Sequence, residues 1–97
     1  MGRAGEEAAG IVKNTERIYA GVKEAMYRVP DVLDKEAGVI GEVKNTQYLS
    51  LTGQLRDYIA FAQQTGYRFV LWTDATLSVP LSNALSAAGA IIKGLVP

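Results

Sequence analysis

The sequence predicts a small α/β (α+β) domain in which helices flank a mixed central sheet. Two observations carry this prediction. Apolar residues repeat at helical spacing over residues 51–65, and residues 67–73 are apolar or aromatic on both strand faces, which is typical of a covered central strand. Shorter patterns around these segments complete the predicted order α-β-β-α-β-α-β. We expect residues 1–97 to form a single domain, because this length suits one core.

The N-terminal part is expected to hold one helix and the first strand. Residues 2–12 are small and helix-compatible, and two acids near their start suit the positive end of a helix dipole. Residues 16–25 are compatible with a short helix or an irregular segment. Residues 26–34 alternate like a strand. Pro30 cannot donate a ladder hydrogen bond, which predicts an edge or a bulge at that point.

A hairpin should follow, with a turn over residues 35–38 and a second strand over residues 39–45. On this second strand the period of two places Ile40, Glu42 and Lys44 on one face.

The helix over residues 51–65 is the clearest element. Thr52 is a suitable N-cap and Gly66 a natural stop. Arg56 and Asp57 should lie on the polar, solvated side of the helix. The apolar stripe comprises Leu51, Leu55, Tyr58, Ile59 and Ala62.

The remaining elements are predicted from Pro and Gly positions. After the strand over 67–73, Pro80 suits the first turn of a helix over 80–88, and Gly89 would end it. Residues 90–96 then form the last predicted strand.

The composition excludes several classes of chemistry. The chain has no Cys and no His, so it holds no disulfide, no Cys/His zinc site and no catalytic His. Carboxylates, Lys, Arg, Tyr, hydroxyls and amides remain, which favours hard-metal or acid/base chemistry. Ten basic residues balance ten acidic ones. This balance argues against a globally basic nucleic-acid binder but permits a local basic patch.

The sequence has no apolar run long enough for a membrane-spanning helix and no signal-peptide pattern. It begins abruptly within a predicted helix, so we expect a fragment of a longer chain.

Charged residues inside apolar strands mark the candidate site. A hairpin would bring Asp31 close to Glu42, and two neighbouring carboxylates repel each other unless a cation lies between them. Carboxylate oxygens with waters and a substrate phosphate are what Mg²⁺ prefers. Lys44 projects to the same face as Glu42 and could orient a water or stabilise charge on a phosphate. The alternative is an exposed hairpin with an ordinary surface ion pair. Asp34 is a rival for Asp31, but a regular strand points it to the opposite face.

Pro30-Asp31, ten intervening residues and then Glu42-Val43-Lys44 resemble the PD-(D/E)xK motif of restriction-endonuclease-like nucleases. The segment Gln54-Leu55-Arg56-Asp57-Tyr58 is similar to the Gln-x-x-x-Tyr element of part of that superfamily. Nearly the whole chain resembles one family of restriction-endonuclease-fold toxin domains of bacterial polymorphic toxin systems. The other resembling stretches are Gly2–Glu6, Tyr27–Leu33 and Leu77–Leu81.

The resemblance implies a metal-dependent nuclease that uses Mg²⁺ (or Mn²⁺). Asp31 and Glu42 would be metal ligands together with the backbone carbonyl of Val43. Lys44 would assist the nucleophilic water.

The resemblance also implies roles for residues on the two helices. Glu6 would match a helical acid that supports the metal site, and Glu7 competes for that role. Gln54 would orient Lys44 or a phosphate, and Arg56 or Tyr58 would touch the nucleic-acid backbone. The favoured alternative for Tyr58 is a core aromatic in the helix stripe.

The substrate implied is nucleic acid, with DNA favoured and RNA possible. Such domains form the C-terminal tip of a secreted effector, act in the cytoplasm of a competing bacterium, and are neutralised by a cognate immunity protein. A non-catalytic protein-binding domain is the alternative from a different class.

Overall fold

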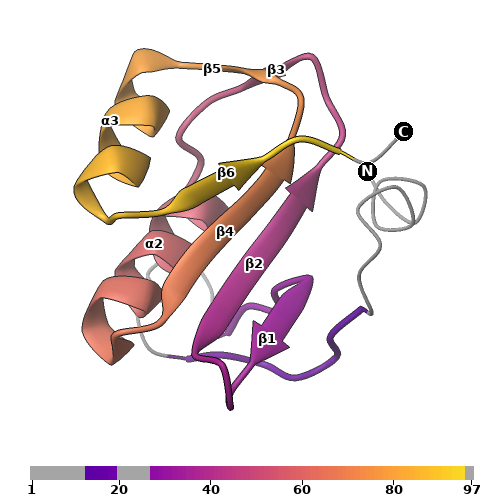
Figure 1. Ribbon diagram of the computed structural model, residues 1–97, viewed down its shortest axis with the longest axis vertical. Helices are drawn as coiled ribbons and strands as arrows, with labels where there is room; N and C mark the ends of the chain where they lie inside the picture. Colours follow the sequence, from indigo (N-terminus) through magenta and orange to yellow (C-terminus); the bar gives the residue numbers. More distant parts are fainter. Residues whose placement is uncertain (1–12, 20–26, 96–97) are drawn as a thin grey trace.

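The computed structural model describes residues 13–19 and 27–95, which form a four-stranded sheet, a separate two-stranded sheet and two helices (Figure 1). The helix predicted over 2–12 therefore lies outside the described residues. The described elements in chain order are β1 (Val32–Asp34), β2 (Val39–Lys44), β3 (Tyr48–Leu49), α2 (Gly53–Thr65), β4 (Arg68–Thr73), β5 (Thr76–Leu77), α3 (Val79–Ala87) and β6 (Ile91–Lys93).

The main sheet is mixed, as the sequence predicts. Its strand order is β1-β2-β4-β6, in which β1 runs antiparallel to β2 and the other neighbours are parallel. Each parallel connection contains a helix, α2 between β2 and β4 and α3 between β4 and β6. The sheet thus has the order and the crossovers of a compact α/β unit.

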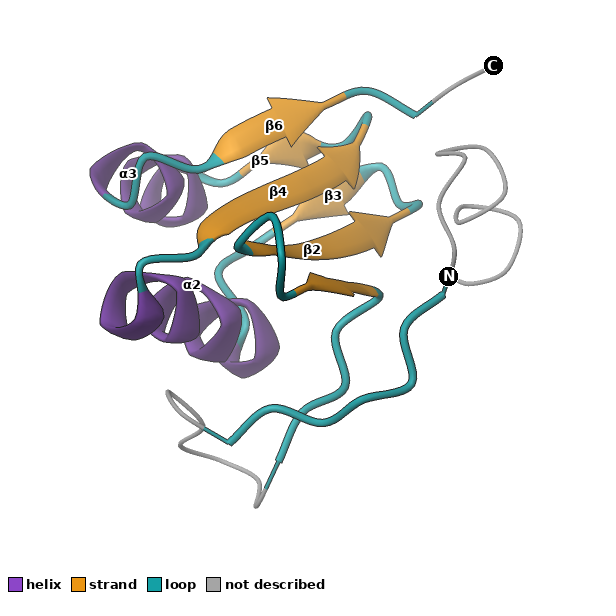
Figure 2. Cartoon of the chain, turned by 60° about the horizontal axis from the view of Figure 1, so that its bottom comes forward, coloured by secondary structure: helices purple, strands orange, loops and turns teal. Residues whose placement is uncertain are grey.

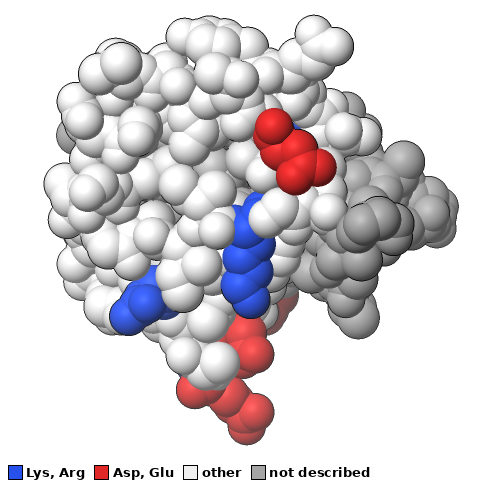
Figure 3. Space-filling view, turned by 45° about the horizontal axis from the view of Figure 1, so that its top comes forward, with Lys and Arg blue, Asp and Glu red and all other residues white. Residues whose placement is uncertain are grey.

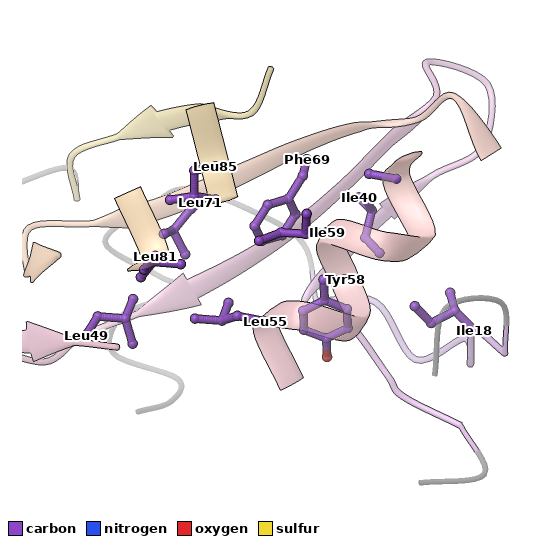
Figure 4. Close-up of a cluster of buried hydrophobic side chains, with 11 residues drawn as sticks. Ile18, Ile40, Leu49, Leu55, Tyr58, Ile59, Phe69, Leu71, Leu81 and Leu85 are labelled. Atoms are coloured by element: carbon purple, nitrogen blue, oxygen red, sulfur yellow. The ribbon is translucent and has the colours of Figure 1, made fainter. Parts of the chain in front are cut away.

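The core lies between one sheet face and the two helices, as Figures 2 and 4 show. Residues of β2 and β4 that share this face alternate with residues of the opposite face, so Ile40, Phe69 and Leu71 point toward the helices. They pack against Leu55, Tyr58, Ile59 and Ala62 of α2 and Leu81 and Leu85 of α3. This packing fixes α2 against β2, the strand that carries the candidate site.

The predicted ends of α2 are confirmed. The Thr52 hydroxyl accepts a hydrogen bond from the Leu55 N–H at 3.2 Å, and Gly66 ends the helix with a φ of 81°. Such a left-handed residue favours glycine, because a residue with a Cβ would strain its own backbone at this positive φ. The predicted first-turn Pro80 of α3 is also observed, and the N-cap of α3 is Ser78.

The strand predicted over 26–34 is only partly correct. Only Val32–Asp34 pair with β2, because the ladder cannot continue through Pro30, which has no N–H. Before Pro30, Arg28 pairs with Ile18 in an isolated antiparallel bridge. Residues 16–19 are therefore extended, in agreement with the irregular alternative for this segment.

The two-residue strands β3 and β5 were not predicted. They pair in parallel as a separate small sheet, with Tyr48 opposite Thr76. Two residues are too few to create a periodic pattern in the sequence. In the described part of the chain, no helix is long and apolar enough to cross a membrane.

Candidate active site

The candidate site forms just before β1 begins, where β2 continues beyond its last residue paired with β1. The Asp31 carboxylate accepts a hydrogen bond from the Val43 N–H at 2.9 Å, and the Asp31 N–H donates to the Glu42 carboxylate at 3.1 Å. The predicted proximity of Asp31 and Glu42 is therefore observed. The side chain of Asp31 takes the place of the strand partner that β2 would otherwise have at Val43.

Pro30 explains why the edge of β2 is open at this point. The register pairs Val32 with Gly41, so extending the ladder by two more residues would place Pro30 opposite Val43. Pro30 has no N–H to donate to the Val43 carbonyl. The N–H and C=O of one strand residue point to the same side, so the Val43 carbonyl faces the edge where Asp31 lies. A backbone oxygen thus joins two carboxylates at the end of the ladder.

Glu42 is an unusual residue because its carboxyl group is only 7% exposed. Burial, with a smaller contribution from the neighbouring Asp31 carboxylate, raises the pKa of Glu42 from 4.5 to about 7. The Lys44 ammonium lies 3.5 Å from Glu42 and opposes this rise without cancelling it. The protein therefore holds a carboxyl group in a place where its negative charge is only partly compensated.

Lys44 is held between strand and helix. Its ammonium group donates to the side-chain oxygen of Gln54 on α2, and Gln54 in turn donates to the Tyr58 hydroxyl at 3.5 Å. Burial and the two nearby carboxylates raise the pKa of Tyr58 above its ordinary value, so the hydroxyl stays protonated. Figure 4 shows the Tyr58 ring in the core with its hydroxyl directed away from the other apolar side chains. Strand and helix are thus connected by a chain of polar contacts.

Thr73 fixes the backbone at the end of β2, a role that no sequence pattern indicates. Its hydroxyl donates to the Lys44 carbonyl at 2.7 Å and accepts from the Ala75 N–H at 3.0 Å. Thr73 is opposite Lys44 in the parallel register and is buried. These bonds hold the backbone of Lys44 where its side chain meets Gln54.

A buried ion pair beside the site was also missed. Asp57 is only 1% exposed, and its carboxylate lies 2.9 Å from the Arg28 guanidinium. The prediction of a solvated Asp57 is therefore wrong. Its spacing of three residues from Gln54 was the available signal, because residues three apart share a helix face. The pair connects α2 to the segment that leads into Asp31.

The other predicted residues fall into distinct places. Asp34 is exposed and its carboxylate accepts from the Ala37 N–H at 3.0 Å, which makes it part of the hairpin turn. Arg56 is exposed on α2, whereas Tyr58 is fully buried. The core interpretation of Tyr58 is thus correct, and direct contact between Tyr58 and a nucleic-acid backbone is not available in this conformation. Glu6 and Glu7 lie outside the described residues.

The donor set fits a hard divalent cation. Asp31, Glu42 and the Val43 carbonyl offer only oxygen ligands, which Mg²⁺ prefers, and a cation would stabilise the negative charge that burial disfavours at Glu42. Among residues 13–19 and 27–95, no group of three or more acidic, His or Cys side chains surrounds a single point. Waters and a substrate phosphate would therefore complete the coordination, as is common for Mg²⁺.

Comparison with known proteins gives one match. The model of the family described as "Restriction endonuclease fold toxin 7" matches residues 2–85. No curated protein and no solved structure gives a significant match. The family match covers the described elements from β1 to β5 and most of α3. It also covers all described site residues. It confirms the family resemblance and the restriction-endonuclease-like fold. The chain therefore belongs to the restriction endonuclease fold toxin 7 family, whose members are toxins built on a nuclease fold.

Proposed function

We propose that the domain is a metal-dependent nuclease toxin that hydrolyses phosphodiester bonds in DNA. The observation that carries this proposal is the buried Glu42 carboxylate, placed against Asp31 and 3.5 Å from the Lys44 ammonium. A buried carboxyl with a raised pKa costs stability, and such costs concentrate at functional sites. A site for a divalent cation accounts for two neighbouring carboxylates at a partly buried position, whereas an ordinary surface ion pair does not.

Three groups would hold the cation: the carboxylates of Asp31 and Glu42 and the Val43 carbonyl. Mg²⁺ (or Mn²⁺) supplies positive charge against a phosphate oxygen and makes a coordinated water more acidic. Backbone N–H groups fix the orientation of both carboxylates, because the Asp31 N–H donates to Glu42 while the Val43 N–H donates to Asp31. This reciprocal bonding preorganises the site before substrate arrives.

Lys44 would act on the substrate side of the cation. Its ammonium group carries three N–H donors. Gln54 and Glu42 use at most two of them, so the third can donate to an attacking water or to a phosphate oxygen. Gln54 positions Lys44, and Tyr58 positions Gln54. Arg56 is exposed on α2, and we assign to it the contact between this helix and the nucleic-acid backbone.

Few phosphate contacts are expected outside the site. On the face seen in Figure 3 the charged side chains are few and of both signs, and no broad basic surface appears there. This agrees with the zero net charge. Affinity for nucleic acid falls with salt in proportion to the number of neutralised phosphates, so a shallow salt dependence is expected.

Incubation of the purified domain with supercoiled plasmid, tRNA and rRNA, each with Mg²⁺, Mn²⁺ or EDTA, tests the proposal. Cleavage of plasmid that requires the divalent ion and is lost in Asp31→Asn and Glu42→Gln supports it. The matched control is Glu36→Gln, which changes an exposed acid of the hairpin turn and should leave the rate unchanged. Preferential cleavage of tRNA or rRNA would reassign the substrate to RNA. Cleavage in EDTA would reject the metal-dependent mechanism.

The biological setting is part of the same proposal. We assign the domain to the C-terminal end of a secreted effector that acts in the cytoplasm of a competing bacterium and is neutralised by a cognate immunity protein. The family of toxins to which the chain belongs supports this setting. Expression in the cytoplasm of a susceptible bacterium should stop growth, and co-expression of the protein encoded immediately downstream should restore it. Unimpaired growth with folded, soluble toxin would contradict the proposal.

A further inference from the structure

Two extended segments next to the site, 13–19 and 27–30, carry an exposed aromatic cluster. Ile18 and Arg28 form an antiparallel bridge, with hydrogen bonds of 2.7 and 3.0 Å between their backbones. Both side chains of the bridge point inward: Ile18 is 3% exposed and packs in the core, and Arg28 reaches Asp57. Their chain neighbours must therefore point outward, because side chains alternate along extended backbone.

The outward side chains form an arginine–tyrosine cluster. Tyr19 and Tyr27 lie opposite each other with ring centroids 6.4 Å apart and a tilt of 53°. The Arg17 guanidinium lies 4.1 Å from the centre of the Tyr27 ring. Tyr19 is 62% exposed and Tyr27 is 39% exposed, and Arg17 is exposed as well. We call these three residues the aromatic platform.

The platform is directly connected to the candidate site. The Asn14 N–H donates to the Asp31 carbonyl at 2.8 Å, and the Asn14 side chain donates to the Pro30 carbonyl at 2.9 Å. Figures 1 and 2 show the two segments running beside each other below β1. Tyr27 precedes Asp31 by four residues, so their Cα atoms are at most about 14 Å apart. In a duplex, each strand carries one phosphate per about 3.4 Å of helix axis, and an unpaired strand can be more extended, so about four nucleotides or fewer span that distance.

The chemistry of the platform matches an unpaired nucleobase. Tyrosine rings offer flat apolar faces on which bases stack, and Arg adds a second planar surface and donors for phosphate. Bases within a duplex are stacked on each other and cannot use such faces. A cross-strand aromatic pair also stabilises a sheet, but that role does not require the high exposure of Tyr19.

We propose that Arg17, Tyr19 and Tyr27 bind an unpaired segment of the nucleic-acid substrate next to the cleavage site. An unpaired base stacks on the tyrosine rings, and Arg17 contacts an adjacent phosphate. This inference rests on the proposed nuclease function and specifies the substrate further: a single strand, a loop or a frayed end is bound more tightly than a fully paired duplex.

Binding by the inactive Lys44→Ala protein, measured by fluorescence anisotropy in EDTA, tests the platform separately from cleavage. The probes are a labelled single-stranded oligonucleotide and a blunt duplex of the same sequence. Tyr19→Ala and Tyr27→Ala should each weaken single-strand binding by about five- to 150-fold and leave duplex binding nearly unchanged. Tyr19→Phe should retain binding, because the phenyl ring keeps a stacking face.

The matched control is Tyr48→Ala, since Tyr48 is a comparably exposed tyrosine (59%) on β3, away from the platform. If Tyr19→Ala and Tyr48→Ala have the same effect on single-strand binding, the proposal is overturned. It is also overturned if the platform variants bind nucleic acid normally but lose the immunity protein, which would make the cluster a protein-docking surface. Plasmid cleavage by the unmodified protein is measured in parallel. Cleavage together with unaffected binding refutes the platform alone, and absence of cleavage in every condition refutes the nuclease.

Discussion

Replacing Glu42 with Gln should stabilise the metal-free protein at neutral and alkaline pH. The folded state holds the Glu42 proton up to about pH 7, whereas the unfolded chain releases it near 4.5. The folded state therefore binds more protons between these values, and its stability falls as the pH rises from about 4.5 to 7. The displacement of the pKa corresponds to about 3 kcal/mol. Gln keeps a carbonyl oxygen for the Asp31 N–H but carries no charge, so it avoids this loss.

The assay is urea unfolding of the wild type and Glu42→Gln in EDTA at pH 4 and pH 8. Glu42→Gln should gain about 3 kcal/mol relative to the wild type between these two pH values. Glu36→Gln, which alters an exposed acid, should show no comparable difference. Added Mg²⁺ should raise the free energy of unfolding of the wild type at pH 8 and leave Glu42→Gln unchanged. If the stability difference between Glu42→Gln and the wild type is the same at pH 4 and pH 8, the buried Glu42 does not hold its proton to near neutral pH and the prediction is wrong.

Three further predictions concern the metal, the buried ion pair and the sheet. Mg²⁺ affinity of the wild type, measured by calorimetry, should be about tenfold weaker at pH 6 than at pH 8, because the cation must displace the Glu42 proton; equal affinities would contradict this. Asp57→Ala should lower the free energy of unfolding by about 3 kcal/mol, since it leaves Arg28 without its buried carboxylate, and plasmid cleavage should fall with it; unchanged stability would remove the pair's structural role. Gly41→Ala should lower thermal stability by about 1–3 kcal/mol, because a Cβ would lie 2.5 Å from Trp72; an unchanged melting temperature would mean that Trp72 moves freely.

Local chemistry explains which elements were predictable. The ends of α2 followed from Thr52 and Gly66, whose capping preferences need no tertiary context. The proximity of Asp31 and Glu42 followed from the hairpin, since β1 and β2 are joined by a short turn. The long strand over 26–34 was not correct, because alternation cannot show that a chain leaves a sheet at Pro30 and pairs with residues 14–18.

Two residues of the site, Asp57 and Thr73, could not be predicted because their roles depend on contacts between segments far apart in the sequence. Asp57 is buried because the segment before Asp31 brings Arg28 to it across 29 positions of sequence. Thr73 is part of the site because β4 runs parallel to β2, so that the two strand ends meet. The sequence next to Asp57 or Thr73 does not reveal these distant partners. Gln54 was predicted because the family resemblance indicated its partner, Lys44.

The proposed site also explains the zero net charge. The chain has no His and no Cys, and two of its acids, Asp31 and Glu42, meet beside β2, where a bound cation would balance their charge. Lys44, Arg17 and Arg56 are then the bases that meet the substrate. Catalysis would depend on few, well-placed charges, with a broad basic surface unnecessary for binding.

The decisive measurement asks whether Lys44 takes part in cleavage. It compares the initial rate of plasmid cleavage by the wild type with that of Lys44→Ala, at saturating Mg²⁺ and pH 8. Lys35→Ala is the matched control, because Lys35 is an exposed lysine of the hairpin turn whose ammonium group lies 3.2 Å from the exposed Glu16 carboxylate. Urea unfolding establishes that all three proteins are folded. We expect the wild type and Lys35→Ala to cleave plasmid at similar rates, and the rate of Lys44→Ala to be at least about 100-fold lower. Folded Lys44→Ala that cleaves plasmid at the wild-type rate would contradict it.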